Sequence, residues 1–197
     1  DSDRALLLDF QATLETKPEK AIKLEKDALA QIENITADNA RLVSNLHANL
    51  GGLYRMNGHP DLAREHMEKS ISLLDQFNLL HINDSIPQIA NYAMFLTEQQ
   101  EPERGISELQ KLSGIIKEYH SDDCLDYAKV QETLGTIYLM TANLPQAKTH
   151  FKKAFKIYEK IWADEPEMIE AKYQEIQELY PQIGFCIEKN LSGLLTK

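Results

Sequence analysis

Two asparagines, Asn49 and Asn91, stand forty-two residues apart in segments that we expect to be helical. Asparagine is a poor residue for a helix interior because its amide competes for backbone hydrogen bonds, so both positions need a reason. A carboxamide carries donors and an acceptor, and it can pair with the N–H and C=O groups of an extended peptide whatever the peptide's sequence. We interpret the pair as peptide-binding residues. In an alternative interpretation the two side chains hydrogen-bond to each other across neighbouring repeats and contact no ligand.

The sequence offers little for catalysis. It contains no phosphate-binding glycine loop, no HExxH and no GxSxG. Residues 120–124, HSDDC, carry metal-capable side chains, but they lie where a helix should start, and a Ser-Asp-Asp cap accounts for them. We interpret His66 and His150, which are too far apart to act together, as surface residues. We therefore predict a protein that is not an enzyme and that uses no metal and no cofactor.

Composition and charge exclude several classes of partner. The 197 residues are 43% apolar and 26% charged, and 31 acidic against 21 basic side chains give a net charge of −10. This charge repels nucleic acid and favours basic or mixed partners. No apolar run is long enough to span a membrane. Because Cys124 and Cys186 form no CxxC pair, we expect a reducing compartment, the cytoplasm.

An internal period of forty-two residues runs through the chain. Pro18, Pro60 and Pro102 stand at this interval, and the next step reaches Leu144 with Pro145 beside it. A second column, three residues further on, holds a small residue in every unit: Ala21, Ala63, Gly105 and Ala147. Such repetition is typical of solenoid architectures, in which each unit packs on its neighbours.

The spacing inside each unit indicates two helices. Apolar columns recur at steps of three and four, which is the periodicity of a helix face. Proline suits the first position of the second helix, where a missing N–H costs nothing. Gly51 and Gly135 would let paired helices approach closely. We predict first helices at about 2–15, 38–57, 85–99 and 122–141, and second helices at about 18–35, 60–78, 102–119 and 144–162.

These residues resemble the tetratricopeptide repeat (TPR). The best match is Leu134-Gly135-x-x-Tyr138 followed by Ala147, Phe151 and Ala154, and the next best is Leu50-Gly51-x-x-Tyr54 with Ala63. The long unit is similar to the repeats of kinesin light chains and of bacterial peptide-sensing regulators. The first unit departs most, with Asp9 where a small residue belongs and Glu25 where a large apolar one does. We expect that unit to be a terminal cap or to pack on something else.

The resemblance implies an all-α fold, a right-handed TPR-like superhelical solenoid of four helix-turn-helix repeats plus C-terminal capping helices. The four repeats would occupy residues 1–162, at about 1–36, 37–79, 80–120 and 121–162. Residues 163–197 would form the capping helices, at about 165–180 and 182–195.

In this family the first helices line a concave groove, so the resemblance also implies which residues face a ligand. The candidate peptide-binding residues are Asn45, Asn49, Gly52, Arg55, Asn91, Met94, Thr97, Lys129, Thr133 and Thr136. The two asparagines of the first paragraph would fix the peptide backbone. Arg55 and Lys129 would engage carboxylates, and Met94 would offer an adaptable apolar contact.

We therefore predict a protein or peptide interaction module without catalysis, with no nucleic acid or membrane as partner. Two alternatives stay open. One is the peptide-sensing domain of a larger bacterial transcription regulator, since a chain that begins with Asp is expected to be a piece of a longer polypeptide. The other is a structural spacer that assembles with copies of itself. The partner's sequence and the oligomeric state are not indicated by the sequence.

Overall fold

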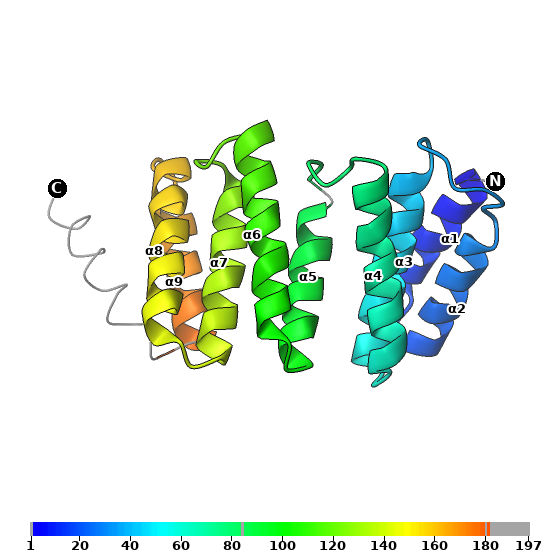
Figure 1. Cartoon of the computed structure of the whole chain (residues 1–197), viewed down its shortest axis with the longest axis horizontal. Helices are drawn as coiled ribbons and strands as arrows, with labels where there is room; N and C mark the ends of the chain where they lie inside the picture. Colours follow the sequence, from blue (N-terminus) through cyan, green and yellow to red (C-terminus); the bar gives the residue numbers. More distant parts are fainter. Residues whose placement is uncertain (1, 84, 180, 182–197) are drawn as a thin grey trace, which may run out of the picture. The chain divides into compact units, whose positions relative to one another are not determined.

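The computed structural model describes residues 2–83, 85–179 and 181, and within them it contains nine α-helices and no strand (Figure 1). The chain divides into two compact units, residues 1–112 and 113–197, which are described separately. Within the described part, no helix is long and apolar enough to cross a membrane. The helices are α1 (Ser2–Leu14), α2 (Pro18–Leu29), α3 (Ala40–Met56), α4 (Pro60–Gln76), α5 (Ser85–Glu98), α6 (Pro102–Tyr119), α7 (Leu125–Met140), α8 (Leu144–Ile161) and α9 (Pro166–Leu179).

The predicted helix pairs and their proline starts are confirmed. Pro18, Pro60 and Pro102 open α2, α4 and α6. The core of the first unit lies between α3, α4 and α5, where Leu50 and Phe95 are buried. The two helices of each pair, α1–α2, α3–α4, α5–α6 and α7–α8, are joined by a short turn and run antiparallel (Figure 1).

One type of turn recurs at the end of three first helices. Gly58, Gln100 and Ala142, spaced by the forty-two-residue period, adopt φ angles of 76°, 64° and 58°. The residue after each of them donates its backbone N–H to a carbonyl five positions earlier, as in Asn143 N to Tyr138 O at 2.7 Å. This left-handed turn satisfies the last carbonyls of the helix, and only the first of the three positions has the glycine that signals it.

Glycines allow close helix approach in three pairs. A Cβ atom added to Gly51 would lie 2.6 Å from Cγ of Met67, and one added to Gly135 would lie 2.9 Å from the Phe151 ring. The tightest backbone approach is at Gly105, where a Cβ would lie 2.6 Å from the carbonyl oxygen of Ala93. The packing reason that the sequence suggested for the small residues is therefore confirmed.

Two helix ends differ from the prediction. α2 ends at Leu29 rather than near residue 35, because a polar turn follows in which Asn39 accepts a hydrogen bond from the backbone N–H of Thr36 and donates one to the carbonyl of Asn34. α7 begins at Leu125 rather than 122. Its cap is Cys124, whose Sγ accepts from the Tyr127 N–H, instead of the expected Ser-Asp-Asp run.

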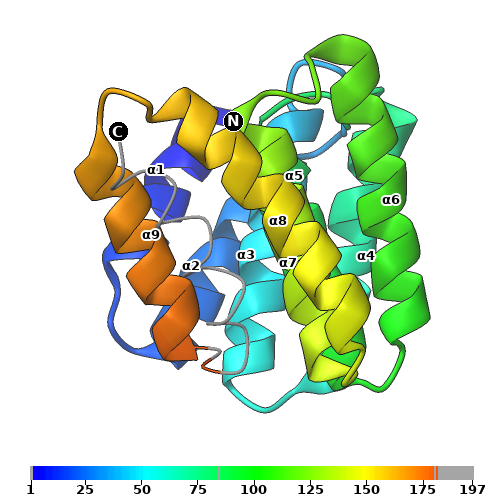
Figure 2. The same ribbon diagram turned by 90° about the vertical axis from the view of Figure 1, so that its left-hand side faces the viewer.

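The second unit contains α7, α8 and α9. Figure 2 shows α9 beside α8, where the rings of Phe155 and Tyr173 stack with centroids 4.4 Å apart. Lys172 of α9 also pairs with Glu132 of α7 at 2.9 Å. α9 thus packs against the repeat before it, as the predicted capping helix would. The second capping helix, predicted at 182–195, lies outside the described residues.

The two histidines interpreted as surface residues are half-buried. His66 stacks on Tyr54, with ring centroids 5.4 Å apart, and its Nδ1 lies 2.8 Å from Nδ1 of His47. Two periods later, His150 stacks on Tyr138 at 5.2 Å, and its Nδ1 lies 2.9 Å from a side-chain oxygen of Gln131. The same packing contact is therefore repeated in both units, with glutamine replacing histidine in the second.

Candidate functional site: the groove of the first unit

Two adjoining hollows in the first unit form the candidate site, and we call them together the groove. The apolar hollow has a volume of roughly 250 Å³ and is lined by Ala48, Gly52, Arg55, Met56, Met67, Ser70, Gln88 and Asn91. The amide hollow has a volume of roughly 290 Å³ and is lined by Asp9, Asn45, Ala48, Asn49, Pro87, Gln88 and Asn91. The hollows share three residues, so a ligand in one would continue into the other.

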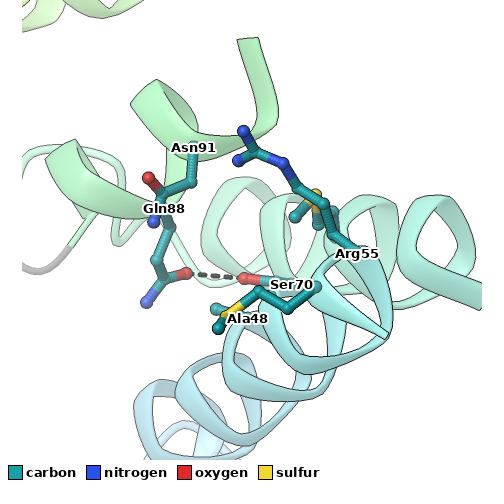
Figure 3. A pocket seen from close by; sticks show the side chains of 8 residues that line it. Ala48, Arg55, Ser70, Gln88 and Asn91 are labelled. Carbon is teal, nitrogen blue, oxygen red and sulfur yellow. Dashed lines mark hydrogen bonds between the residues drawn. The ribbon is translucent and has the colours of Figure 1, made fainter. Parts of the chain in front are cut away.

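A polar cluster in the wall of the groove joins α3, α4 and α5. Gln88 of α5 accepts hydrogen bonds from the hydroxyls of Ser44 and Ser70, at 2.8 and 2.6 Å, and donates to Oδ1 of Asn45 at 2.5 Å. Figure 3 shows the bond between Ser70 and Gln88, with Asn91 and Arg55 nearby. Because both serines are fully buried, their hydroxyls depend on these partners. The cluster fixes α5 against α3.

Asn49 is held by two acidic side chains rather than by Asn91. Its Nδ2 donates to Oδ1 of Asp9 at 2.9 Å and to Oε1 of Glu25 at 3.1 Å. Both partners are acceptors, so the orientation of the amide is fixed by chemistry: the nitrogen faces the acids and Oδ1 is left over. The two acidic residues that depart from the repeat pattern thus bind this asparagine to α1 and α2.

Glu25 is a buried carboxyl group with an unusual proton affinity. It is 1% exposed, and burial, followed by the charge of Asp9, raises the pKa of its carboxyl to about 8. Its Oε2 has no hydrogen-bond donor among the described residues. With its pKa at about 8, Glu25 carries a proton at neutral pH, which avoids burying a carboxylate charge whose second oxygen has no donor in the described part of the chain.

Asn91 and Arg55 stand on opposite sides of the apolar hollow, on α5 and α3 (Figure 3). Asn91 is exposed, and no described residue holds its amide by a hydrogen bond. Arg55 is paired with Glu98 of α5 through two hydrogen bonds, one of them 2.8 Å long from Nε. The amide is therefore free to meet a ligand, whereas the guanidinium charge is already neutralised.

Five of the ten predicted residues line the groove, namely Asn45, Asn49, Gly52, Arg55 and Asn91. The other five do not line either hollow. Met94 is half-buried, and Thr97 is buried with its hydroxyl donating to the carbonyl of Ala93. Lys129, Thr133 and Thr136 belong to the second unit. The two threonines donate to carbonyls of α7 itself, and Lys129 pairs with Asp126 at 3.8 Å.

Sequence reasoning missed several lining residues, above all Asp9 and Gln88. Asp9 had a signal, since an acid replaced the expected small residue. Gln88 had none, because a glutamine on a first helix is an ordinary surface residue until its serine partners are known.

Comparisons with known proteins agree with this fold. Residues 85–160 match the tetratricopeptide repeat family model. A crystal structure of BtubC (BKLC) from P. vanneervenii is similar with a TM-score of 0.73 and 17% identity over 98% of this chain and 80% of that one. Two structures of a putative kinesin light chain with nearly identical TPR-like repeats from Podosopora anserina have TM-scores of 0.64 and 0.62. Both are 14% identical, and they cover 74% and 73% of this chain and 69% and 68% of those chains. No curated protein matches the sequence.

The match of residues 85–160 and the similar structures show that the chain has the all-α fold of TPR-like repeat proteins. The similarity to kinesin light chain repeats agrees with the resemblance drawn from the sequence. The fold suggests a module for protein interactions.

Proposed function

We propose that this chain is a protein-interaction module whose groove binds an extended segment of another polypeptide. The observation that carries the proposal is the pair of adjoining hollows along α3 and α5. Their lining includes five of the residues that the sequence predicted to bind a peptide. Binding a segment by shape and hydrogen bonds requires no reacting group, so the proposed role is not catalytic. A cytoplasmic location, favoured by the cysteine spacing, is part of the same proposal.

The residues of the groove have separate roles in this proposal. The free amide of Asn91 pairs with a backbone N–H and C=O of the bound segment. Met56 and Met67 line the apolar hollow and contact an apolar side chain. Gly52 leaves the hollow open, since a Cβ placed there would have no atom within 4 Å.

The test is to fill the apolar hollow. Short random peptides are selected by display on the whole chain, and their affinities are measured by calorimetry. Gly52→Leu is expected to weaken binding at least tenfold without unfolding the chain, because the new side chain occupies open space and leucine favours helix over glycine. Gly114→Leu on α6 is the matched control, since a Cβ there also meets nothing within 4 Å. Equal affinities of the two variants would contradict the groove assignment.

One observation favours self-assembly as a second candidate. Leu6, Leu7, Phe10 and Leu14 are each more than half exposed and follow one another along α1. An apolar stripe is complementary to a second copy of itself. If copies associate through it, sedimentation of the wild-type chain depends on concentration and that of Phe10→Glu does not. A wild-type chain that stays monomeric at all concentrations contradicts this candidate.

A further inference from the structure

Asn49 presents only an acceptor to a ligand in the amide hollow. Both N–H groups of Asn49 are taken by Asp9 and Glu25, so only its Oδ1 is left to bind a partner. This limits the asparagine more than the sequence indicated, since a free carboxamide would both donate and accept. A ligand group that binds to Asn49 must therefore be a donor.

The only charge among the described residues that line the hollow is negative. Asp9 is half-buried in the wall and carries a carboxylate, and no lysine or arginine lines the hollow in the described chain. Arg55 lines the other hollow and is bound to Glu98. A carboxylate in a concave wall without a cation attracts positive charge more strongly than one on an open surface.

A buried carboxyl group lies behind this wall. Glu25 is 1% exposed and accepts a hydrogen bond from Asn49, and burial, followed by the charge of Asp9, raises the pKa of its carboxyl to about 8. Because Glu25 is therefore neutral at pH 7, the negative charge of this pair of acids lies on Asp9, which lines the hollow.

We propose that the amide hollow binds the cationic side chain of a basic residue, best an arginine, of the bound segment. The inference rests on the proposed function and names the class of peptide that the groove selects. A guanidinium has five N–H donors and no acceptor, which matches the carboxylate of Asp9 beside the amide oxygen of Asn49. A volume of roughly 290 Å³ accommodates such a group. The net charge of −10 on the whole chain attracts the same class of peptide.

The experiment compares two charge-matched variants on the whole chain. Random peptides are selected on the wild-type protein, and the best binder is resynthesised with each basic residue replaced in turn by citrulline, a neutral isostere of arginine. Affinities are then measured for wild type, Asp9→Asn and Asp27→Asn. Asp27 is exposed on α2 and lines neither hollow, so its variant removes one negative charge outside the site. Circular dichroism confirms that each variant is folded.

We expect selected peptides to carry a basic residue at one fixed position. Its replacement by citrulline should weaken binding to the wild type about tenfold, because the charged hydrogen bond to Asp9 is lost. The same replacement should change the affinity for Asp9→Asn almost not at all, because that variant has already lost this bond. Asp27→Asn should behave as wild type. Peptides that bind in competition with each other but have no basic preference would overturn this inference and leave the proposed function standing. Failure to select any peptide whose binding Gly52→Leu weakens would overturn both.

Discussion

Replacing Glu25 by glutamine should change how the stability of the first unit depends on pH. Glu25 is buried, and its pKa is raised from 4.5 to about 8 by burial and by the charge of Asp9. Above pH 4.5 the unfolded chain releases this proton while the folded chain retains it until pH 8. Stability is therefore fully present below pH 4.5 and falls as pH rises toward 8.

The size of this loss of stability follows from the shift in the pKa of Glu25. From pH 4.5 to pH 7 the loss is about 1.4 kcal/mol for each pH unit, or about 3 kcal/mol in total, as an upper bound for this buried group. Glutamine has the shape of the protonated acid and still accepts a hydrogen bond from Asn49, but it has no proton to lose. The free energy of unfolding of Glu25→Gln should therefore equal that of the wild type near pH 4 and exceed it by up to about 3 kcal/mol at pH 7.

Hydrogen exchange of peptides from α2 and α3, measured from pH 4 to pH 8, reports the stability of this unit locally, which matters because the chain has two units. The difference between variant and wild type cancels the titration of other groups. Glu19→Gln, at an exposed position of α2, is the control for the loss of a carboxyl group outside the core. Parallel pH profiles for Glu25→Gln and wild type would refute the reasoning. So would a carboxyl resonance of Glu25 that titrates near 4.5 in a carbon NMR experiment.

Three further substitutions have expected effects on stability. The pKa of His47 is lowered to about 4 by burial and by its neighbouring histidine, so stability should fall by about 1–2 kcal/mol as pH drops from 7 to 5. His47→Gln, which copies Gln131 of the second unit, should flatten this loss in melting curves at the two pH values. Gly105→Ala forces a Cβ against the Ala93 carbonyl and should lower stability by about 1–3 kcal/mol. Gly114→Ala meets no atom and should raise it by about 0.5–1 kcal/mol. Melting shifts of the same sign for the two glycine variants would contradict the packing account.

Most of the fold could be predicted because it depends on residue types that recur at a fixed spacing along the sequence. Three prolines mark helix starts, and small residues such as Gly51 mark close helix contacts, so both features can be found without tertiary information. The helix ends that were missed depend on side-chain bonds of single residues. Asn39 stabilises a loop in place of the last turns of α2, and Cys124 caps α7 although cysteine is not a usual cap.

For the candidate site, the sequence predicted which positions face the groove but not which of their hydrogen bonds are already made. The periodic frame brought Asn49 and Asn91 to the groove, but the frame carries no information about which hydrogen bonds are already made inside the fold. Asn49 is tied to acids from two other helices, and Arg55 is neutralised by an acid forty-three residues later. Such pairings join residues far apart in sequence, so they become visible only in three dimensions.

The polar cluster of Ser44, Ser70 and Gln88 has a consequence for the thermodynamics of recognition. Because these side chains bond to one another and to Asn45, the amides of Gln88 and Asn45 in the groove are already oriented before any partner arrives. A receptor that is rigid in advance loses little conformational entropy on association, so the ordering cost falls almost entirely on the incoming segment. Partners that are stiff when free, such as segments held extended by proline, should therefore be favoured over flexible ones of equal contact chemistry.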